Sequence, residues 1–523
     1  MSRLKKFTHS LFSSYVFLGV NVLYTLASVP LALKYLSKAE FGLWALTLQI
    51  AGYISLVDLG MGSSISRILI DHKDEQANGR YGGAIKSSFL VGLAQGLIVL
   101  VVGLSLVWFM AVWLRVPQDL SRQFLWLMIG QVFLTAATFM SRIFGQLLYA
   151  WQRMDVGNYY GIAQLAIGFA VLWIGFHFGL GIYSLLAGAA ASWICGVVLN
   201  AAACFRLGFW PRAGEWGRAS REQFHELFSY GAELFLITIG TQLIVSSQTV
   251  LVSRQLGMEA AALWSVMTKL FTLVTQIVTK IVGNAMPAFA EMQVRQERAR
   301  LWDRYRGLFI IANVFAGLCG VLLAACNGPF VSIWTHGRFS WPATDNVLLA
   351  LWLILSTQQC CHNSLIMCLK HIRGLKYIFL LEGVLFVGVA VFVLPANGIT
   401  GMLICSLVAT ALCTWLCGVW RIAELSGKGW EPLVWDWQWP LFWIVGFMVP
   451  CWLASEWMLR GAPDWLRLVI NCGLLTLIGT WVSLRFALPS DLAVEMVGKL
   501  PQPLQRMAII LGGPACRRDI ERA

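Results

Sequence analysis

The sequence predicts an all-α, polytopic membrane protein of about fourteen transmembrane helices. Of its 523 residues, 58% are hydrophobic and only 12% are charged, which is about half the charged fraction of a soluble domain. Long apolar runs recur along the chain with no long polar stretch between them, and Lys and Arg gather in alternate loops. Such a chain cannot cover itself with polar surface in water, so the apolar runs are expected to form one membrane body.

Each predicted span is an apolar run long enough to cross about 30 Å of hydrocarbon at about 1.5 Å per residue. The first run follows Arg3, Lys5 and Lys6 and is too long for a signal peptide, so we expect it to remain as a span. Turns at 177–181 and 395–398 divide two over-long stretches into antiparallel pairs. The expected spans are 11–33, 42–66, 84–112, 124–148, 158–177, 180–204, 227–251, 261–289, 307–334, 346–369, 376–395, 398–420, 437–459 and 464–487.

Charge distribution predicts the orientation. The loops on the side of the N-terminus hold 29 Lys and Arg residues, and those on the opposite side hold 8. Cytoplasmic loops carry the excess of positive residues, so both termini are expected in the cytoplasm and the loops 116–122 and 336–345 outside. Topology thus accounts for the net charge of +13, and nothing further indicates a nucleic-acid partner.

The thirteen cysteines lie mostly within apolar runs, where a thiol behaves as a small hydrophobic group. No CxxC pair or His–Cys cluster lies in a loop. The sequence therefore predicts neither a disulfide framework nor a metal site, and it indicates no cofactor.

An internal repeat predicts two related lobes. Residues 35–44 (YLSKAEFGLW) echo residues 255–264 (QLGMEAAALW) at an offset of 220, which also pairs Arg142 with His362. Both lobes would start on the cytoplasmic side, so the repeat is parallel and its axis lies along the membrane normal, an arrangement typical of alternating access. Chance similarity between apolar helices is the alternative. The expected divisions are a six-helix lobe at 1–205, a cytoplasmic linker at 206–226, a second six-helix lobe at 227–420, an extra helix pair at 437–487 and a cytoplasmic interfacial tail at 488–523.

One segment carries a family resemblance. Residues 31–44 (LALKYLSKAEFGLW), 54–62 (ISLVDLGMG) and 64–67 (SISR) resemble the N-terminal signature of bacterial polysaccharide-biosynthesis flippases. These belong to the multidrug, oligosaccharidyl-lipid and polysaccharide (MOP) exporter superfamily. The resemblance implies that an oligosaccharide on a polyprenyl diphosphate is turned from the cytoplasmic to the outer leaflet of a bacterial inner membrane. Such a transporter would serve export of lipopolysaccharide or exopolysaccharide and would work beside a polysaccharide polymerase and export machinery.

Polar residues inside the spans predict a cationic cavity. Lys269, Gln276 and Lys280 lie within about 20° of one line along the span 261–289. An ionisable group in a span is costly, so it tends to face a cavity or a partner. Arg142 lies near a span end, where snorkelling is an equal explanation, and Lys280 has an alternative as a structural partner of Glu233. The expected substrate-binding residues are Lys269, Lys280, Gln276, Arg142, Asn21, Ser28, Thr241, Gln248 and His362.

Three acids are candidates for coupling transport to an ion. Asp58, Glu233 and Glu382 each lie in an apolar run, where they would bind H+ or Na+ or pair with a cation. Structural pairing is an equal explanation for each of them.

The leading function is therefore a lipid-linked oligosaccharide flippase, which is not an enzyme. A drug/cation antiporter of the same superfamily is the alternative, and it would favour an acidic cavity. A membrane polysaccharide polymerase or ligase is disfavoured because such enzymes usually carry a sizeable external loop, whereas the outer loops here are short.

Overall fold

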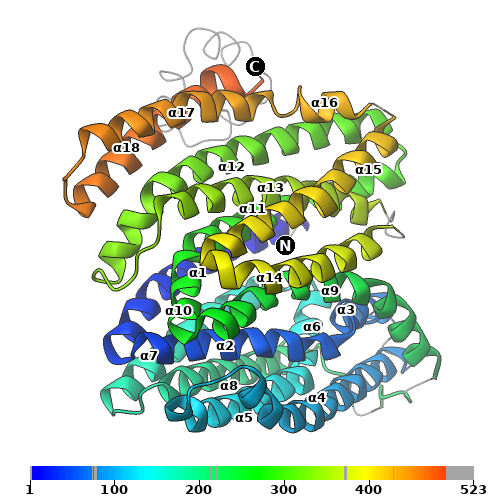
Figure 1. Cartoon of the computed structure of the whole chain (residues 1–523). Coiled ribbons are helices and arrows are strands. Elements are labelled where there is room, and N and C mark those ends of the chain that lie inside the picture. The colour runs from blue at the N-terminus through cyan, green and yellow to red at the C-terminus, as the bar shows by residue number, and fades with distance from the viewer. Residues whose placement is uncertain are drawn as a thin grey trace. The chain divides into compact units, whose positions relative to one another are not determined.

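The computed structural model describes residues 3–73, 75, 79–212, 214–218, 221–369, 374–427 and 429–489, apart from the side chains of 3–11, 63, 221–223, 225–234 and 287. All regular elements in these ranges are helices, as predicted (Figure 1). The chain forms two compact units, which we call unit 1 (Met1–Ser265) and unit 2 (Val266–Ala523).

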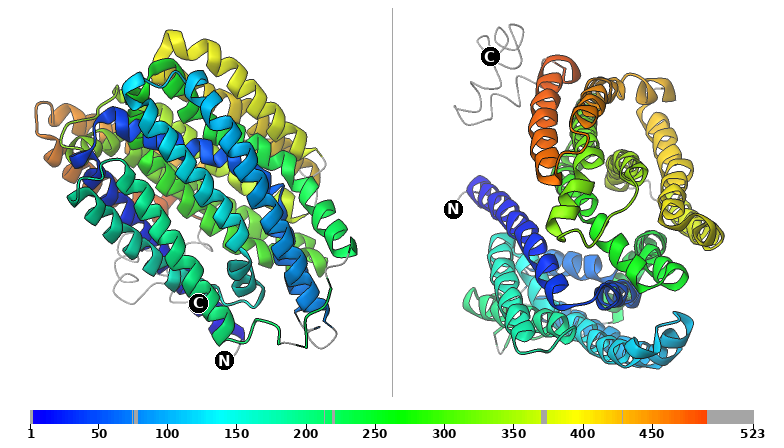
Figure 2. Two further views of the ribbon diagram at one scale, coloured as in Figure 1. Left: turned by 90° about the horizontal axis from the view of Figure 1, so that it is seen from below. Right: turned by 60° about the vertical axis from the view of Figure 1, so that its left-hand side comes forward.

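Unit 1 is a bundle of long helices joined by short turns. Its elements are α1 (Arg3–Tyr35), α2 (Lys38–Ile54), the short 3₁₀ helix η1 (Ser55–Asp58), α3 (Met61–His72), α4 (Arg80–Trp113), α5 (Gln118–Ser141), α6 (Ile143–Ala150), α7 (Met154–His177), α8 (Tyr183–Arg206), α9 (Arg221–Leu256) and α10 (Met258–Met267), whose last two residues belong to unit 2. Helix α4 packs along α5, and α7 packs along α8 and α1 (Figure 2).

Local sequence sets the helix ends. Ser37 and Glu40 form a capping box at the start of α2, because the Ser37 hydroxyl accepts from the Glu40 amide at 3.2 Å and the Glu40 carboxylate accepts from the Ser37 amide at 2.9 Å. The predicted turn at 177–181 is confirmed, since Gly179 and Gly181 there have φ angles of 77° and 53°.

Unit 2 is also a bundle of long helices, and its last two long helices lie in the predicted extra pair at 437–487. Its elements are α11 (Lys269–Val294), α12 (Arg298–Trp334), α13 (Ala343–Cys368), α14 (Leu375–Thr410), the π-helical turn η2 (Ala411–Trp415), α15 (Leu416–Ser426), α16 (Trp430–Val434), α17 (Trp439–Met458), α18 (Asp464–Val482) and the π-helical turn η3 (Ser483–Ala487). Gly398 (φ 56°, ψ −144°) interrupts α14, so the predicted division at 395–398 separates its two arms.

A buried amide network holds the added helix pair in unit 2. Gln438 lies directly before α17 and accepts from Gln358 of α13 at 2.8 Å and from Asn313 of α12 at 3.1 Å. Its own amide nitrogen donates to Gln358 at 3.0 Å. All three side chains are buried. These hydrogen bonds thus attach the start of α17 to α12 and α13 in the core of unit 2.

The structure confirms the positions of the predicted helices but not that fourteen of them cross the membrane. Helices occupy all fourteen predicted ranges. Within the described residues, eleven helices are long and apolar enough to cross a membrane, or twelve with the bent pair α10–α11. The two arms of α14 count there as one helix, and α13 is not among the eleven. The polytopic all-α fold is confirmed, while fourteen stays a prediction.

The predicted lobes differ in extent from the compact units. Helix α9, expected as the first helix of the second lobe, packs on α2 and α3 inside unit 1. The six-plus-six division for transport therefore stays a prediction, and so does the tail at 488–523, because residues 490–523 lie outside the description.

Candidate functional site

The second predicted span is interrupted inside unit 1. Between η1 and α3 the backbone turns through Leu59 (φ 50°) and Gly60 (φ 75°), both left-handed. A carboxylate oxygen of Asp58 accepts from the amide of Gly62 at 3.3 Å. Gln95 of α4 donates to the carbonyls of Val57 and Asp58, both at 2.9 Å. Polar backbone groups freed by the break therefore have partners, as hydrocarbon surroundings demand.

Arg142 joins this break to a second one. It lies between α5 and α6 and is the one residue that separates the two helices of the fourth predicted span. Its guanidinium donates to the carboxylate of Asp58 and to the side-chain oxygen of Gln95. The side chains of Arg142 and Asp58 are only 13% and 30% exposed. We call Asp58, Gln95 and Arg142 the break cluster. Arg142 thus has a half-buried acidic partner, which snorkelling to solvent does not provide.

The remaining polar groups of the fourth predicted span pack within unit 1. Ser66 of α3 donates to Gln146 of α6, and the hydroxyl of Thr135 donates to the carbonyl of Gln131 at 2.8 Å. Gln131 and Thr135 are buried. The first contact links α3 to α6, and the second satisfies the hydroxyl of Thr135 within α5 itself.

In unit 2, both predicted lysines lie on α11 and are half-buried, whereas Gln276 between them is exposed. Neither Lys269 nor Lys280 has an ion pair or hydrogen bond with any other described residue. The side chain of Glu233, the alternative partner of Lys280, lies outside the description.

Lys269 is also the first residue of α11, directly after a 46° bend between α10 and α11. Asn327 of α12 donates to the carbonyl of Met267 at this bend, at 3.1 Å. A cation at a helix N-terminus opposes the helix dipole. Its position is therefore unfavourable for stability, which favours a functional reason for this lysine.

His362, paired by the repeat with Arg142, has different surroundings. It is 0% exposed, lies 4.8 Å from the ring of Phe309 in a stacked arrangement, and shares a 2.7 Å hydrogen bond with the hydroxyl of Tyr305. The structure thus places His362 in an aromatic cluster of unit 2, and its role as a substrate ligand stays a prediction.

The polar residues of α1 and α9 are satisfied mainly by backbone. On α1, Thr25 donates to the carbonyl of Asn21 at 2.9 Å, and Ser28 donates to the carbonyl of Thr25 at 3.4 Å. On α9, the exposed Thr241 donates to its own helix, whereas Gln248 is buried and its amide nitrogen has no partner among the described residues. Binding of substrate by these side chains stays a prediction.

Glu382 is more buried than Asp58, the other candidate acid whose side chain the structure describes. It is 1% exposed, and one carboxylate oxygen has no partner among the described residues. The other side of the carboxylate is hydrogen-bonded by Thr410 and Thr414, at the π-helical turn η2. Turns of this kind often mark functional sites. No described cation pairs with Glu382, in contrast to Asp58.

Sequence reasoning missed Gln95 and Tyr305. Gln95 is a lone amide in an otherwise apolar run, which is a usable signal. Tyr305 stands in a basic stretch that the charge distribution predicts to be cytoplasmic, and nothing in the sequence there indicates that it is fully buried against His362.

Comparison with known proteins shows the family. The model of the polysaccharide biosynthesis protein family matches residues 9–293, more than half of the chain. No curated protein sequence matches.

Solved structures show the same fold. An inward-facing multidrug resistance MATE family transporter of the MOP superfamily is 14% identical, with a TM-score of 0.61 over 77% of this chain and 95% of that one. An outward-facing MATE transporter is 13% identical, with a TM-score of 0.55 over 81% and 97%. A MOP superfamily transporter from Pyrococcus furiosus is 15% identical, with a TM-score of 0.52 over 80% and 96%. The chain has the MATE-like fold of these transporters, and it belongs to the polysaccharide biosynthesis protein family.

Proposed function

We propose that the protein carries an oligosaccharide linked to a polyprenyl diphosphate from the cytoplasmic to the outer leaflet of a bacterial inner membrane, by alternating access. The observation that carries the proposal is the pair of lysines on α11. Both lie on α11, which together with α10 is long and apolar enough to cross a membrane. Neither side chain has an acidic partner among the described residues. Two unpaired ammonium groups are costly there unless water or an anionic ligand meets them.

The spacing of the lysines suits a diphosphate that changes depth. Eleven residues separate them, which corresponds to about 16 Å along the helix. In surroundings of low dielectric each ammonium attracts phosphate more strongly than it does in water. On this proposal the diphosphate head group passes from Lys280 to Lys269 while the lipid-linked oligosaccharide moves from one leaflet to the other. The glycan moves with it, and no covalent bond changes.

An apolar cavity on the same helix suits the lipid part of the substrate. It has a volume of 340 Å³ and lies between α11, α12 and the end of α18. Its lining is almost entirely apolar and includes Val278 and Ile281, which flank Lys280 in the sequence. A lipid diphosphate needs an apolar channel beside a cation, and both features belong to α11.

Glu382 is favoured over Asp58 as the coupling group. Asp58 already has a cationic partner, while Glu382 has none among the described residues. A buried carboxylate with a free oxygen and two hydroxyl neighbours would hold H+ or Na+, and release of that ion would be linked to the return step. Replacement by Gln would then weaken the dependence of export on the ion gradient.

A drug/cation antiporter is the second candidate, because the solved structures of the same fold include multidrug transporters. Positive lysines on α11 disfavour a cationic substrate. Family and fold are those of transporters, so the polymerase or ligase alternative gains no support.

Two measurements test the proposal. In a bacterial strain lacking its own flippase, Lys269→Ala and Lys280→Ala should each reduce glycan export, and the double variant should abolish it. Lys34→Ala, an exposed lysine at the end of α1, is the matched control. Variants must be inserted and abundant. Normal export by both single variants would refute a cationic pathway.

The second measurement separates the two transporters. Purified protein in nanodiscs should bind a polyprenyl diphosphate more tightly than the uncharged polyprenol, and Lys280→Ala should remove most of that difference. Preferential binding of a lipophilic cation such as tetraphenylphosphonium would favour the antiporter instead.

A further inference from the structure

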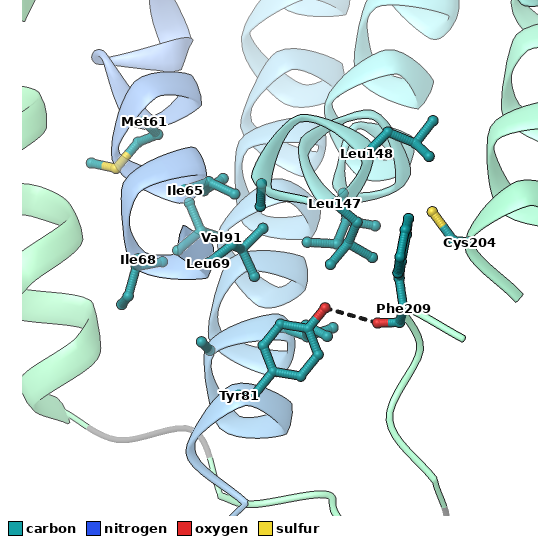
Figure 3. Close-up of a cluster of buried hydrophobic side chains, with 14 of the residues drawn as sticks. Met61, Ile65, Ile68, Leu69, Tyr81, Val91, Leu147, Leu148, Cys204 and Phe209 are labelled. Atoms are coloured by element: carbon teal, nitrogen blue, oxygen red, sulfur yellow. Dashed lines mark hydrogen bonds between the residues drawn. The ribbon is translucent and has the colours of Figure 1, made fainter. Parts of the chain in front are cut away.

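Helix α17 carries aromatic side chains on an exposed face. In the core of unit 1, by contrast, an aromatic ring is enclosed: Tyr81 is 1% exposed, and its hydroxyl donates to the carbonyl of Phe209 at 2.8 Å (Figure 3). On α17, Trp439 and Phe442 are 59% and 49% exposed. Packing inside unit 2 therefore does not account for these two rings.

The exposed rings border a cavity. Its volume is 320 Å³, at the lower end of the range for ligand pockets, which is about 300–1,000 Å³. The lining residues share one face of α17 at helical spacing, and we call them the aromatic groove: Trp439, Phe442, Trp443, Gly446 and Phe447. A Cβ added to Gly446 would meet no atom within 4 Å, so the glycine leaves this space free.

A ring from the end of the next helix holds the groove in shape. Phe486, in the turn η3 after α18, stacks on Phe447 with ring centroids 5.7 Å apart and on Trp443 with ring centroids 5.4 Å apart. Trp443 also meets Trp439 edge to face, with centroids 6.0 Å apart. Aromatic pairs of this kind have preferred geometries, so the rings fix one another in place.

A cation lies beside the groove. Arg485 directly precedes Phe486, and its guanidinium carbon lies 5.9 Å from the centroid of that ring. The side chain of Arg485 is exposed and has no ion pair with any other described residue. The acids Glu431 and Asp436, which precede α17 in the sequence, are also exposed, so water screens their charge. An apolar groove thus lies next to a free positive charge.

Both features lie at the predicted membrane surface. Trp439 is two residues inside the start of the predicted span 437–459, and Arg485 is two residues inside the end of the predicted span 464–487. From Trp439 to Phe447 the helix advances about 12 Å. The groove would therefore extend from the head groups into the acyl chains of the leaflet on the side of the termini, which the charge distribution predicts to be cytoplasmic.

We propose that the aromatic groove binds one anionic phospholipid of the cytoplasmic leaflet, with its phosphate on Arg485 and one acyl chain along the rings. A phosphate forms charge-assisted hydrogen bonds with a guanidinium. The indole N–H groups of Trp439 and Trp443 have no partner among the described residues and are available to oxygen atoms of the head group. This lipid is a resident ligand and not the transported one, since the groove shares no lining residue with the apolar cavity beside α11.

Photo-cross-linking tests the proposal. Purified full-length protein in phosphatidylcholine nanodiscs receives a trace of phosphatidylglycerol that carries a diazirine in its acyl chain, and adducts are located by peptide mass spectrometry after irradiation. Adducts should concentrate in residues 439–447, and a phosphatidylcholine probe with the same acyl chain should label them less. Arg485→Gln should reduce labelling by phosphatidylglycerol about fivefold, which corresponds to about 1 kcal/mol for one basic residue at an anionic surface.

Each variant has a matched control. Arg306→Gln removes another exposed arginine of unit 2 that has no ion pair with any described residue, and it should leave the labelling unchanged. Gly446→Leu fills the groove without a clash and should abolish the labelling of 439–447. Gly473→Leu makes the same change at an exposed, open position of α18 and should not. Gel filtration checks that each variant is folded.

Several results would overturn the proposal. Equal labelling by the two probes, or labelling that Arg485→Gln leaves unchanged, would show an ordinary lipid-facing surface. Labelling that survives Gly446→Leu would place the lipid outside the groove. Labelling that appears only after removal of residues 490–523 would show that the tail of the chain covers the groove. No step of this experiment uses the glycan, so its outcome is independent of the proposed function.

Discussion

Removing Arg142 should destabilise the protein severely, because it leaves Asp58 without its cation inside a membrane span. The change considered is Arg142→Ala. It deletes a guanidinium that is 13% exposed and donates to both Asp58 and Gln95. Breaking a buried ion pair by removing one partner costs about 3–5 kcal/mol, and this pair should lie near the lower end of that range because Asp58 is 30% exposed. With about 2–4 °C per kcal/mol, as for a domain of about 250 residues, the melting temperature should fall by about 6–12 °C.

The neutral double variant Asp58→Asn/Arg142→Gln provides the comparison. Both charges are then absent, and the amides can still hydrogen-bond, so most of the lost stability should return. The measurement is the thermal unfolding of detergent-purified protein, followed by tryptophan fluorescence and by recovery of the monodisperse peak in gel filtration. A full double-mutant cycle with Asp58→Asn gives the coupling between the two residues.

Two results would refute this reasoning. One is an Arg142→Ala protein that unfolds at the temperature of the wild type. The other is a double variant no more stable than the single one, which would show that Arg142 acts through something other than Asp58. Reduced export by a fully stable Arg142→Ala protein would instead support the predicted role of this residue in the cavity.

Three further predictions concern packing and topology. Gly42→Val should lower the melting temperature and the yield, because a side chain there meets the backbone of α10, whereas Gly145→Val, which has open space around it, should fold normally. A single cysteine in place of Glu215 should react with an impermeant maleimide only in inside-out vesicles. A single cysteine in place of Arg338 should react only in intact spheroplasts, and the reverse pattern would show that the predicted topology is inverted. Protease added to inside-out vesicles should trim the region 488–523, since its prolines and arginines disfavour a further span, and full protection there would contradict a cytoplasmic tail.

The sequence predicted the helices well because an apolar run of about twenty residues has few alternatives in a membrane. The turn at Gly179 and the interruption at Gly398 were both visible as glycine-containing breaks. The break at Gly60 was not predicted, since the run 42–66 reads as one continuous span. Its cause is tertiary: Asp58, Gln95 and Arg142 together satisfy the polar groups that the break exposes.

The sequence identified individual residues of the candidate site but did not predict which of them contact one another. Asp58 and Arg142 were each identified as a costly charge in a span, yet 84 residues separate them. Periodicity assigns a side chain to a face of its helix and leaves open which helix lies opposite. The packing of α9 shows the same limit, because the repeat predicts which helix it resembles and not which neighbour it touches.

Gln438 limits how far the chain can be shortened from its C-terminal side to the two predicted lobes. A chain ending at Ser426 would keep both repeat halves but would leave the amides of Gln358 and Asn313 without the group that now bridges them. In hydrocarbon such orphaned amides are strongly unfavourable. Gln358 would still accept from the indole of Trp415 at 2.6 Å, whereas the side chain of Asn313 would lose the partner of its amide nitrogen. A protein shortened in this way should therefore be stabilised by an apolar residue in place of Asn313.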